Sequence, residues 1–428
     1  MTVNRTQAPP IHDAVTFDLT LPKANLQTCP NGTELIWYAG GSQDVAEVTW
    51  IFPAGVWFEK QEGVAIAMGA LLRNGTTTKT AAHLNTAIEF YGASLRCVVT
   101  NDDAHVILHC LSKHLIHLLP LVKEILTESE FEQTELDIYI KNNLQNLQVN
   151  LLKPDFVASQ YIDKQIFGEQ HPYGRHTKKE VLENLKREEI LTFYKERIVE
   201  KQPKIFVAGR IDDSHLKSIE NFFGTNARSP EQEDQPLAYE IKSSTERKLT
   251  LINDPKGVQT ALRIGKIFPN RQHPDFAALV VLNTLFGGYF GSRLMTNIRE
   301  DKGYTYGIYS SIMPARQGGA LVIQSEVGKN VADPAIKEIY KELEILNDKK
   351  VCEAELQLVK NYLLGNLLGD LDGPFNIIQR WKSLLLNGHT IENFDRNISI
   401  FKNVTPGELL KLTHLYFHPE SFYEVAVT

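Results

Sequence analysis

The sequence ELDIYIKNNLQNLQVNLLKP at Glu135–Pro154 returns in altered form as ELQLVKNYLLGNLLGDLDGP at Glu355–Pro374, 220 residues further along the chain. Seven of the twenty positions are identical, and they extend from inside a long helical pattern to the proline beyond it. In the first copy the identical residues are Glu135, Leu136, Leu144, Asn146, Leu147, Leu151 and Pro154. The offset is close to half of the 428 residues, and each half runs in the order helix, strand pair, further helices. We therefore predict a duplicated domain.

A polar, charged and proline-containing stretch separates the two halves, namely NARSPEQEDQ at Asn226–Gln235. This composition is typical of a linker. We predict an N-terminal domain at 1–225, a linker at 226–240 and a C-terminal domain at 241–428. The length is enough for two domains, and the hydrophobic share of 43% is enough for a sizeable core in each.

Local patterns in the first half indicate both helices and strands. Gly63–Leu72 is apolar on every face and precedes Asn74-Gly75, so we predict a fully buried helix. Thr80–Tyr91 has a threonine cap and an amphipathic pattern, which predicts a second helix. Ser94–Thr100 and Ala104–Leu111 flank an Asn-Asp-Asp turn and predict an antiparallel pair. This mixture indicates an α+β fold with helices packed over an antiparallel sheet.

Composition argues against several classes of function. The net charge is -7 and there is no basic stripe, so we expect no nucleic-acid partner. The four cysteines are scattered and form no CxxC pair, which argues against a disulfide framework and against a thiolate zinc site. No apolar run reaches the roughly 18 residues of a membrane helix, and the polar start MTVNRTQAPPI shows no export signal. We expect a cytoplasmic protein with no membrane contact.

The histidines do not form a convincing metal site. His105 and His109 have the four-residue spacing of helical zinc ligands. Their surroundings, AHVILHCL, predict a strand, which would hold the two imidazoles roughly 13 Å apart. We interpret them as residues on a sheet face and predict no metal ligands in this chain.

A glycine cluster, GGYFGSRL, occupies Gly287–Leu294. A glycine-rich turn that opens a helix leaves backbone N–H groups free to bind an anion or a carbonyl oxygen. We therefore predict Gly287, Gly288 and Gly291 as substrate-binding residues. The alternative is a helix entry that needs only a close backbone approach. The cluster is no nucleotide motif, because the lysine and carboxylate partners of such motifs are missing.

The segment NIREDKGYTYGIYSS at Asn297–Ser311 predicts a helix that stops at Gly303 and an aromatic strand after it. Arg299 would lie in the last helical turn and Tyr306 on the strand, and both could point into one cleft. An arginine offers a fixed fork of N–H donors, and a tyrosine hydroxyl can stabilise a developing oxyanion. Taken alone, such residues more often offset a helix dipole and pack in a sheet.

Together these segments resemble the M16 (insulinase, pitrilysin-like) peptidase family. Its second domain carries a glycine-rich helix entry, then RLxxxxRExxG, and a tyrosine seven residues after the second arginine. The first half also resembles the family at Gly75-Thr76, at Gly92 and at His171-Pro172-Tyr173-Gly174. The resemblance implies two homologous domains of the LuxS/MPP-like metallohydrolase fold, each an antiparallel sheet with helices mainly on one face. The residues that match the second-domain motif are Arg293, Leu294, Arg299, Glu300, Gly303 and Tyr306.

The zinc site of the family has no counterpart at the matching positions. Members bind zinc through an inverted HxxEH motif on the first helix and a glutamate on the later long helix. By resemblance, the two histidines fall on Ile66 and Ala70, the general base on Gly69 and the distal glutamate on Asn146. A branched alkyl group, a methyl and a hydrogen can neither bind Zn²⁺ nor accept a proton from water. We expect no cofactor in this chain.

In heterodimeric bacterial members of the family, one subunit holds the zinc and a partner resembling this chain supplies the Arg/Tyr pair. The resemblance therefore implies a zinc-free subunit, inactive alone, that joins an HxxEH-bearing, zinc-binding subunit in peptide degradation or processing. Arg299 and Tyr306 would act in trans on the partner's site. Two alternatives remain: a scaffold or peptide-binding core-type subunit with no part in catalysis, and a stand-alone metallopeptidase with unusual ligands.

Overall fold

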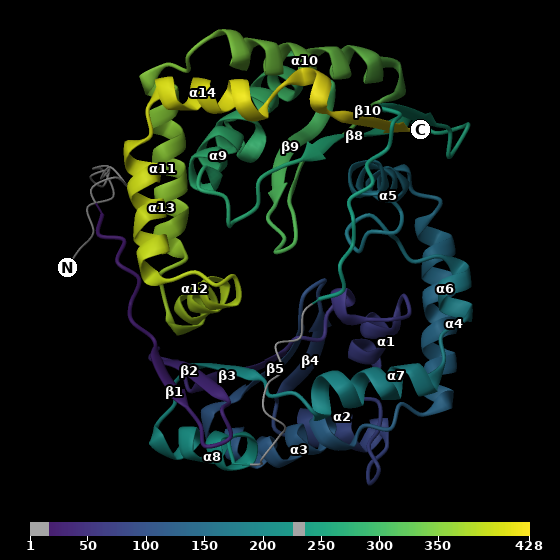
Figure 1. The fold of residues 1–428 in the computed structure, drawn as a ribbon, viewed down its shortest axis with the longest axis vertical. Coiled ribbons are helices and arrows are strands. Elements are labelled where there is room, and N and C mark those ends of the chain that lie inside the picture. The colour runs from purple at the N-terminus through teal and green to yellow at the C-terminus, as the bar shows by residue number, and fades with distance from the viewer. Residues whose placement is uncertain (1–16, 226–235) are drawn as a thin grey trace, which may run out of the picture. The chain divides into compact units, whose positions relative to one another are not determined.

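The computed structural model describes residues 17–225 and 236–428 (Figure 1). It has the predicted α+β fold, with helices and two sheets. Most of the predicted linker, 226–240, lies outside the described residues, so the predicted domain bounds stay a prediction. Within the described ranges, no helix is both long enough and apolar enough to cross a membrane.

Contacts divide the chain into two compact units. The larger unit comprises Lys23–Ile267, Gly373–Ser383 and Tyr423–Thr428. The smaller unit comprises Phe268–Asp372 and Leu384–Phe422, together with residues 17–22.

The first sheet lies in the larger unit and has the strand order β1-β2-β6-β3-β5-β4. Neighbouring strands are antiparallel, except that β2 and β6 run parallel. The predicted strand pair is confirmed as β4 and β5, with Ser94 opposite His109. The strands are β1 (Asn25–Thr28), β2 (Glu34–Ala39), β3 (Val45–Phe52), β4 (Ser94–Val99), β5 (Ala104–Leu111) and β6 (Lys204–Gly209).

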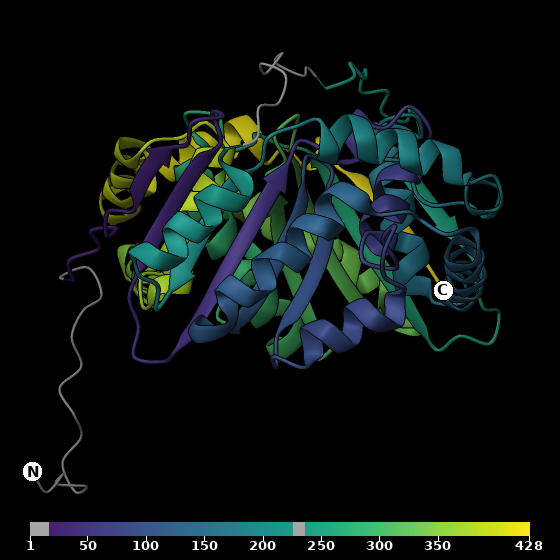
Figure 2. The ribbon, with the colours of Figure 1, turned by 90° about the horizontal axis from the view of Figure 1, so that it is seen from below.

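Helices cover mainly one face of this sheet. Trp50 of β3 shares a hydrophobic core with Met68 of α1, Leu119 of α3 and Phe223 of α8. In Figure 2, α3 and α8 lie in front of the strands. The predicted second helix is confirmed as α2, whose cap Thr80 accepts a hydrogen bond from the N–H of His83. The helices are α1 (Val64–Leu71), α2 (Ala81–Glu89), α3 (Leu115–Glu128), α4 (Gln133–Asn150), α5 (Pro154–Phe167), α6 (Lys179–Glu183), α7 (Arg187–Tyr194) and α8 (Asp213–Phe223).

The second sheet repeats the pattern of the first. In the larger unit, β11 (Tyr423–Val427) pairs parallel with β7 (Lys248–Leu251) and antiparallel with β8 (Gln259–Ile267). In the same way, β6 pairs parallel with β2 and antiparallel with β3. In the smaller unit, β9 (Thr305–Met313) and β10 (Ala320–Gly328) form an antiparallel pair, as β4 and β5 do. The helices of this half are α9 (Phe276–Asn283), α10 (Ala332–Asp348), α11 (Glu353–Gly369), α12 (Pro374–Leu386), α13 (Ile391–Asn403) and α14 (Pro406–Tyr416).

The two repeated prolines each begin a helix that packs against the sheet of the other half. Pro154 is the first residue of α5 and Pro374 the first of α12, where a missing N–H costs nothing. Helix α5 packs on β8 and β11. Helix α12 packs on the first sheet, where the rings of Phe375 and His109 lie 6.5 Å apart. This exchange explains why Gly373–Ser383 belong to the larger unit.

Candidate functional site

Helix α1 carries three of the four positions at which the resemblance places the zinc machinery. Ile66 and Ala70 are exposed, Ile66 by 43%, and Gly69 is buried. The prediction of a fully buried helix is therefore wrong at Ile66 and Ala70, which lie one turn apart on one face. The sequence of α1 is apolar all round, so it could not show which face the neighbouring α4, α7 and β4 leave open.

The general-base position is closed by side chains of the edge strand β4. A Cβ atom built on Gly69 would lie 2.3 Å from Cγ2 of Val99 and 3.4 Å from Sγ of Cys97. Interiors are packed too densely to absorb such an overlap without movement. Asn146 is exposed on α4. The described part of the chain contains no cluster of three His, Cys, Asp or Glu residues suited to a metal ion. These residues do not fit a zinc ion.

The start of α1 is held by a buried ion pair that was not predicted from the sequence. The Glu59 carboxylate accepts hydrogen bonds from the N–H groups of Ala65 (2.8 Å) and Gly63 (3.2 Å) and pairs with Arg175. The carboxylate thus satisfies N–H groups that have no partner within the helix, and its charge offsets the positive end of the helix dipole. Burial raises the pKa of Glu59, although the Ala65 N–H and Arg175 act in the opposite direction.

The His171-Pro172-Tyr173-Gly174 motif packs beside this ion pair. The N–H of Tyr173 donates to Nδ1 of His171 at 3.1 Å, and the His171 ring meets Trp57 edge-on at 5.3 Å. Burial and the neighbouring Arg175 both lower the pKa of His171.

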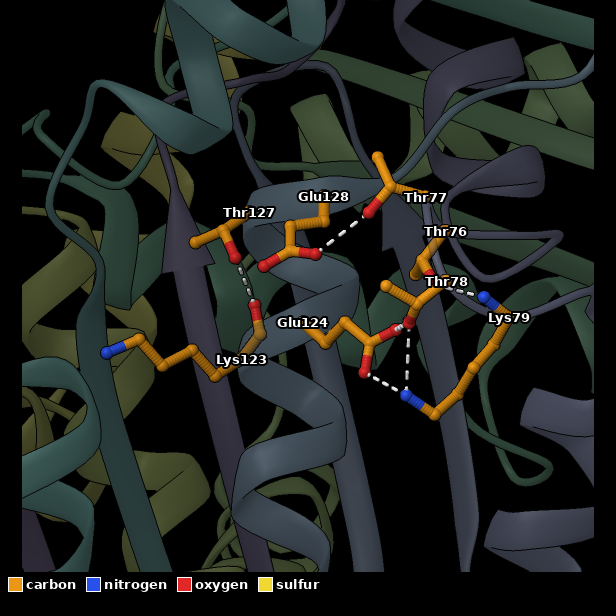
Figure 3. Close-up of polar contacts among 8 residues, drawn as sticks. All are labelled: Thr76, Thr77, Thr78, Lys79, Lys123, Glu124, Thr127 and Glu128. Carbon is orange, nitrogen blue, oxygen red and sulfur yellow. Dashed lines mark hydrogen bonds and ion pairs between the residues drawn. The ribbon is translucent and has the colours of Figure 1, made fainter.

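The loop after α1, which begins at the Gly75-Thr76 pair, is tied to helix α3 (Figure 3). The hydroxyls of Thr76 and Thr78 each donate to Glu124 Oε1 at 2.6 Å, and Lys79 pairs with Glu124 Oε2. Burial acts to raise the pKa of Glu124, but these bonds outweigh it and hold that pKa below its ordinary value. This polar network holds the loop after α1 against helix α3.

The glycine cluster lies between two helical segments. Its last glycine, Gly291, comes just before the helical turn that begins at Arg293, as the sequence predicted. Gly287 and Gly288 end the π-helix η5 (Thr284–Gly288), and Gly291 precedes the π-helix η6 (Met295–Asp301). A Cβ atom on Gly287 would lie 2.7 Å from Cβ of Ser310 on β9. A Cβ atom on Gly291 would lie 2.9 Å from the Tyr289 ring. Close packing against Ser310 therefore accounts for Gly287, and the Tyr289 ring fills the space beside Gly291. Substrate binding at the cluster stays a prediction.

The structure brings Arg299 and Tyr306 together in the smaller unit. Arg299 lies in the last turn of η6 and Tyr306 on β9, as predicted. The Nε–H of Arg299 donates to the backbone oxygen of Tyr306 at 2.9 Å. The guanidinium lies 4.6 Å from the ring centre of Phe290 and 5.9 Å from that of Tyr306, within the range of cation–π attraction. Tyr306 is 94% exposed, so its hydroxyl is presented to solvent.

The first arginine of the motif is structural. Arg293 makes a bidentate ion pair with Glu355 of α11, at 2.7 Å from Nε and 2.9 Å from Nη2. Glu355 is one of the repeated residues, and its counterpart Glu135 accepts from Nδ2 of Asn74 at 2.8 Å. In both halves this glutamate therefore links the long helix, α4 or α11, to the segment that follows α1 or α9. The sequence showed both residues but not their pairing.

This arrangement presents hydrogen-bond donors without a metal. The guanidinium of Arg299 can bind a peptide carbonyl through Nη groups, and the exposed hydroxyl of Tyr306 can donate to a developing oxyanion. Such donors assist acyl transfer only when another group activates the attacking water.

Comparisons with known proteins match both parts of the chain to one family. The family model described as Insulinase (Peptidase family M16) matches residues 40–179, and the model described as Peptidase M16 inactive domain matches residues 184–363. An uncharacterized zinc protease of Bacillus subtilis, YmxG, is 24% identical over 369 residues, which cover 85% of this chain and 88% of YmxG.

Solved structures share the fold. A protease from Helicobacter pylori superposes with a TM-score of 0.86 at 17% identity, covering 95% of this chain and 100% of that chain. A peptidase M16 inactive domain from Pseudomonas fluorescens superposes with a TM-score of 0.82 at 18% identity, covering 95% and 98%. The two family models account for both halves of the sequence in order. The chain therefore belongs to the M16 (insulinase) peptidase family.

Proposed function

We propose that this chain is the non-zinc-binding subunit of a heterodimeric M16 zinc metalloendopeptidase, a pseudoenzyme when alone. One contrast supports the proposal. The position of the general base, Gly69, is closed by Val99 and Cys97, whereas Tyr306 is 94% exposed and Arg299 lies against it. The chain has lost the groups that bind metal and activate water but keeps the groups that bind and stabilise a reacting carbonyl.

In this proposal, Arg299 orients the backbone of a peptide substrate and Tyr306 stabilises the oxyanion formed when that peptide is attacked. An HxxEH-bearing M16 partner subunit would supply the zinc site, and this chain would bind no metal. The names of the relatives are compatible with either half of such a pair, since one is called a zinc protease and another an inactive domain. The cytoplasmic location expected from the sequence belongs to the proposal, and cell fractionation tests it.

The experiment is peptide hydrolysis by three preparations: this chain alone, the HxxEH subunit alone, and their mixture. Each is assayed with zinc and with a chelator. We expect hydrolysis only in the mixture, and its loss on chelation. If the HxxEH subunit is fully active alone and indifferent to this chain, the proposal fails and the scaffold function replaces it.

A further inference from the structure

Strand β9 contains a β-bulge at Tyr306. Thr305 lies opposite Val327 of β10, whereas Ile308 lies opposite Ser325. Between these pairs β9 advances by three residues and β10 by two, so Tyr306 and Gly307 together face Glu326. One extra residue in one strand is the definition of a bulge, and bulges are common where a side chain must be re-aimed.

The bulge decides the side of the sheet on which Tyr306 lies. Side chains alternate along a regular strand, so Tyr306 would share a face with Ile308 and Ser310. Both of those residues are buried, at 0% and 3% exposure. The extra residue shifts Tyr306 to the face of Tyr309, which is 45% exposed, and Tyr306 itself is 94% exposed.

Three side chains satisfy the backbone groups that the bulge removes from the ladder. The Thr305 hydroxyl donates to the backbone oxygen of Glu326 at 2.7 Å and accepts from the N–H of Gly307 at 3.0 Å. The Ser325 hydroxyl donates to the backbone oxygen of Gly307 at 2.9 Å and lies 2.9 Å from Thr305 Oγ1. Arg299 donates to the backbone oxygen of Tyr306. Unpaired backbone groups would destabilise the bulge. The hydrogen bonds from these side chains therefore stabilise the bulged strand relative to a regular one.

We propose that Thr305 and Ser325 are positioning residues, which hold the bulge so that the Tyr306 hydroxyl faces the substrate. The inference rests on the proposed function for its catalytic meaning, but the positioning itself is a property of this chain alone. Threonine and valine have nearly the same shape, and valine suits a regular strand. Thr305→Val therefore removes the hydrogen bonds of the Thr305 hydroxyl without opening a cavity, and it favours the unbulged register.

The positioning is tested by nitration of exposed tyrosines in the intact chain with tetranitromethane, followed by peptide mass spectrometry. Tyr309 serves as the internal reference. In Thr305→Val we expect the nitration of Tyr306 relative to Tyr309 to fall severalfold, and Thr305→Ser, which keeps the hydroxyl, should restore it. Ser311→Ala, an exposed residue of the same strand, is the matched control and should leave the ratio unchanged. An unchanged ratio in Thr305→Val overturns the inference, whatever happens to activity.

The catalytic meaning is tested in the mixture with the HxxEH subunit. We expect Thr305→Val to lower kcat towards the value of Tyr306→Phe with little change in KM, and Thr305→Ser to recover it. Ser325→Ala provides a second variant if Thr305→Val does not fold, and it should shift both readouts in the same direction. If the nitration ratio falls while kcat stays at the wild-type value, the positioning stands and the proposed use of Tyr306 in catalysis fails.

Discussion

Gly69→Ala should destabilise this chain, although alanine is the better helix former. Gly69 lies inside α1, where the added methyl would approach Cγ2 of Val99 to 2.3 Å. Gly365 is also a helical glycine, inside α11, but a Cβ atom there meets nothing within 4 Å. The two substitutions are chemically identical and differ only in the space available.

The expected magnitudes follow from this difference. Replacing a helical glycine by alanine gains up to about 1 kcal/mol when the site is open, and we expect this gain at Gly365. Overpacking a dense interior costs about 1–3 kcal/mol, so Gly69→Ala should be less stable than Gly365→Ala by about that amount. Because Val99→Ala removes the clashing methyl, Gly69→Ala combined with Val99→Ala should lose less stability than the sum of the single variants.

Denaturant unfolding followed by tryptophan fluorescence measures these differences, since Trp50 is fully buried in the core that contains α1. A Gly69→Ala midpoint raised to the same extent as that of Gly365→Ala would refute the closed general-base position. The closed position would also be refuted if the stability changes of Gly69→Ala and Val99→Ala simply added in the double variant.

Three further predictions concern protonation, the motif ion pair and zinc. Burial and the nearby Arg175 hold the folded-state pKa of His171 below its ordinary value of 6.5, so the unfolded chain binds the proton first. Stability should fall as the pH drops below about 6.5, by at most about 1.4 kcal/mol per pH unit for one proton, and unfolding midpoints should show a weaker dependence in His171→Gln. Glu355→Gln leaves Arg293 without its anionic partner, so it should lower the free energy of unfolding by about 1–3 kcal/mol. Glu353→Gln, on the exposed side of the same helix, is the control and should change that free energy by less than about 0.5 kcal/mol in the same assay. Equilibrium dialysis should find no stoichiometric zinc on the isolated chain, and a tightly bound equivalent would contradict the loss of the site.

Features that depend on local pattern were predictable from the sequence. The repeat that begins at Glu135–Pro154 predicted two long helices, α4 and α11, and the proline at which the next helix, α5 or α12, begins. Thr80 marked the cap of α2, and the Asn-Asp-Asp turn marked the β4–β5 pair. Period, caps and turn residues act within a few positions of one another, so one sequence is enough to show them.

Features that depend on distant contacts were not predictable. The exchange of α5 and α12 between the sheets is decided by surfaces far apart in the chain. The closure of Gly69 depends on Val99, thirty residues later. The sequence placed Tyr306 on a strand, but alternation alone would have put it on the buried face beside Ile308. Only the strand register reveals the extra residue that turns it outward.

The central claim is that this chain contributes chemistry to its partner's site, and Tyr306→Phe tests it most directly. The substitution removes one oxygen from a side chain that is 94% exposed, so the fold and the complex should be preserved. With complex formation verified by size-exclusion chromatography, we predict that kcat of the mixture falls by about 100-fold, the usual loss for one oxyanion donor. A mixture that retains the wild-type rate with Tyr306→Phe would contradict the account.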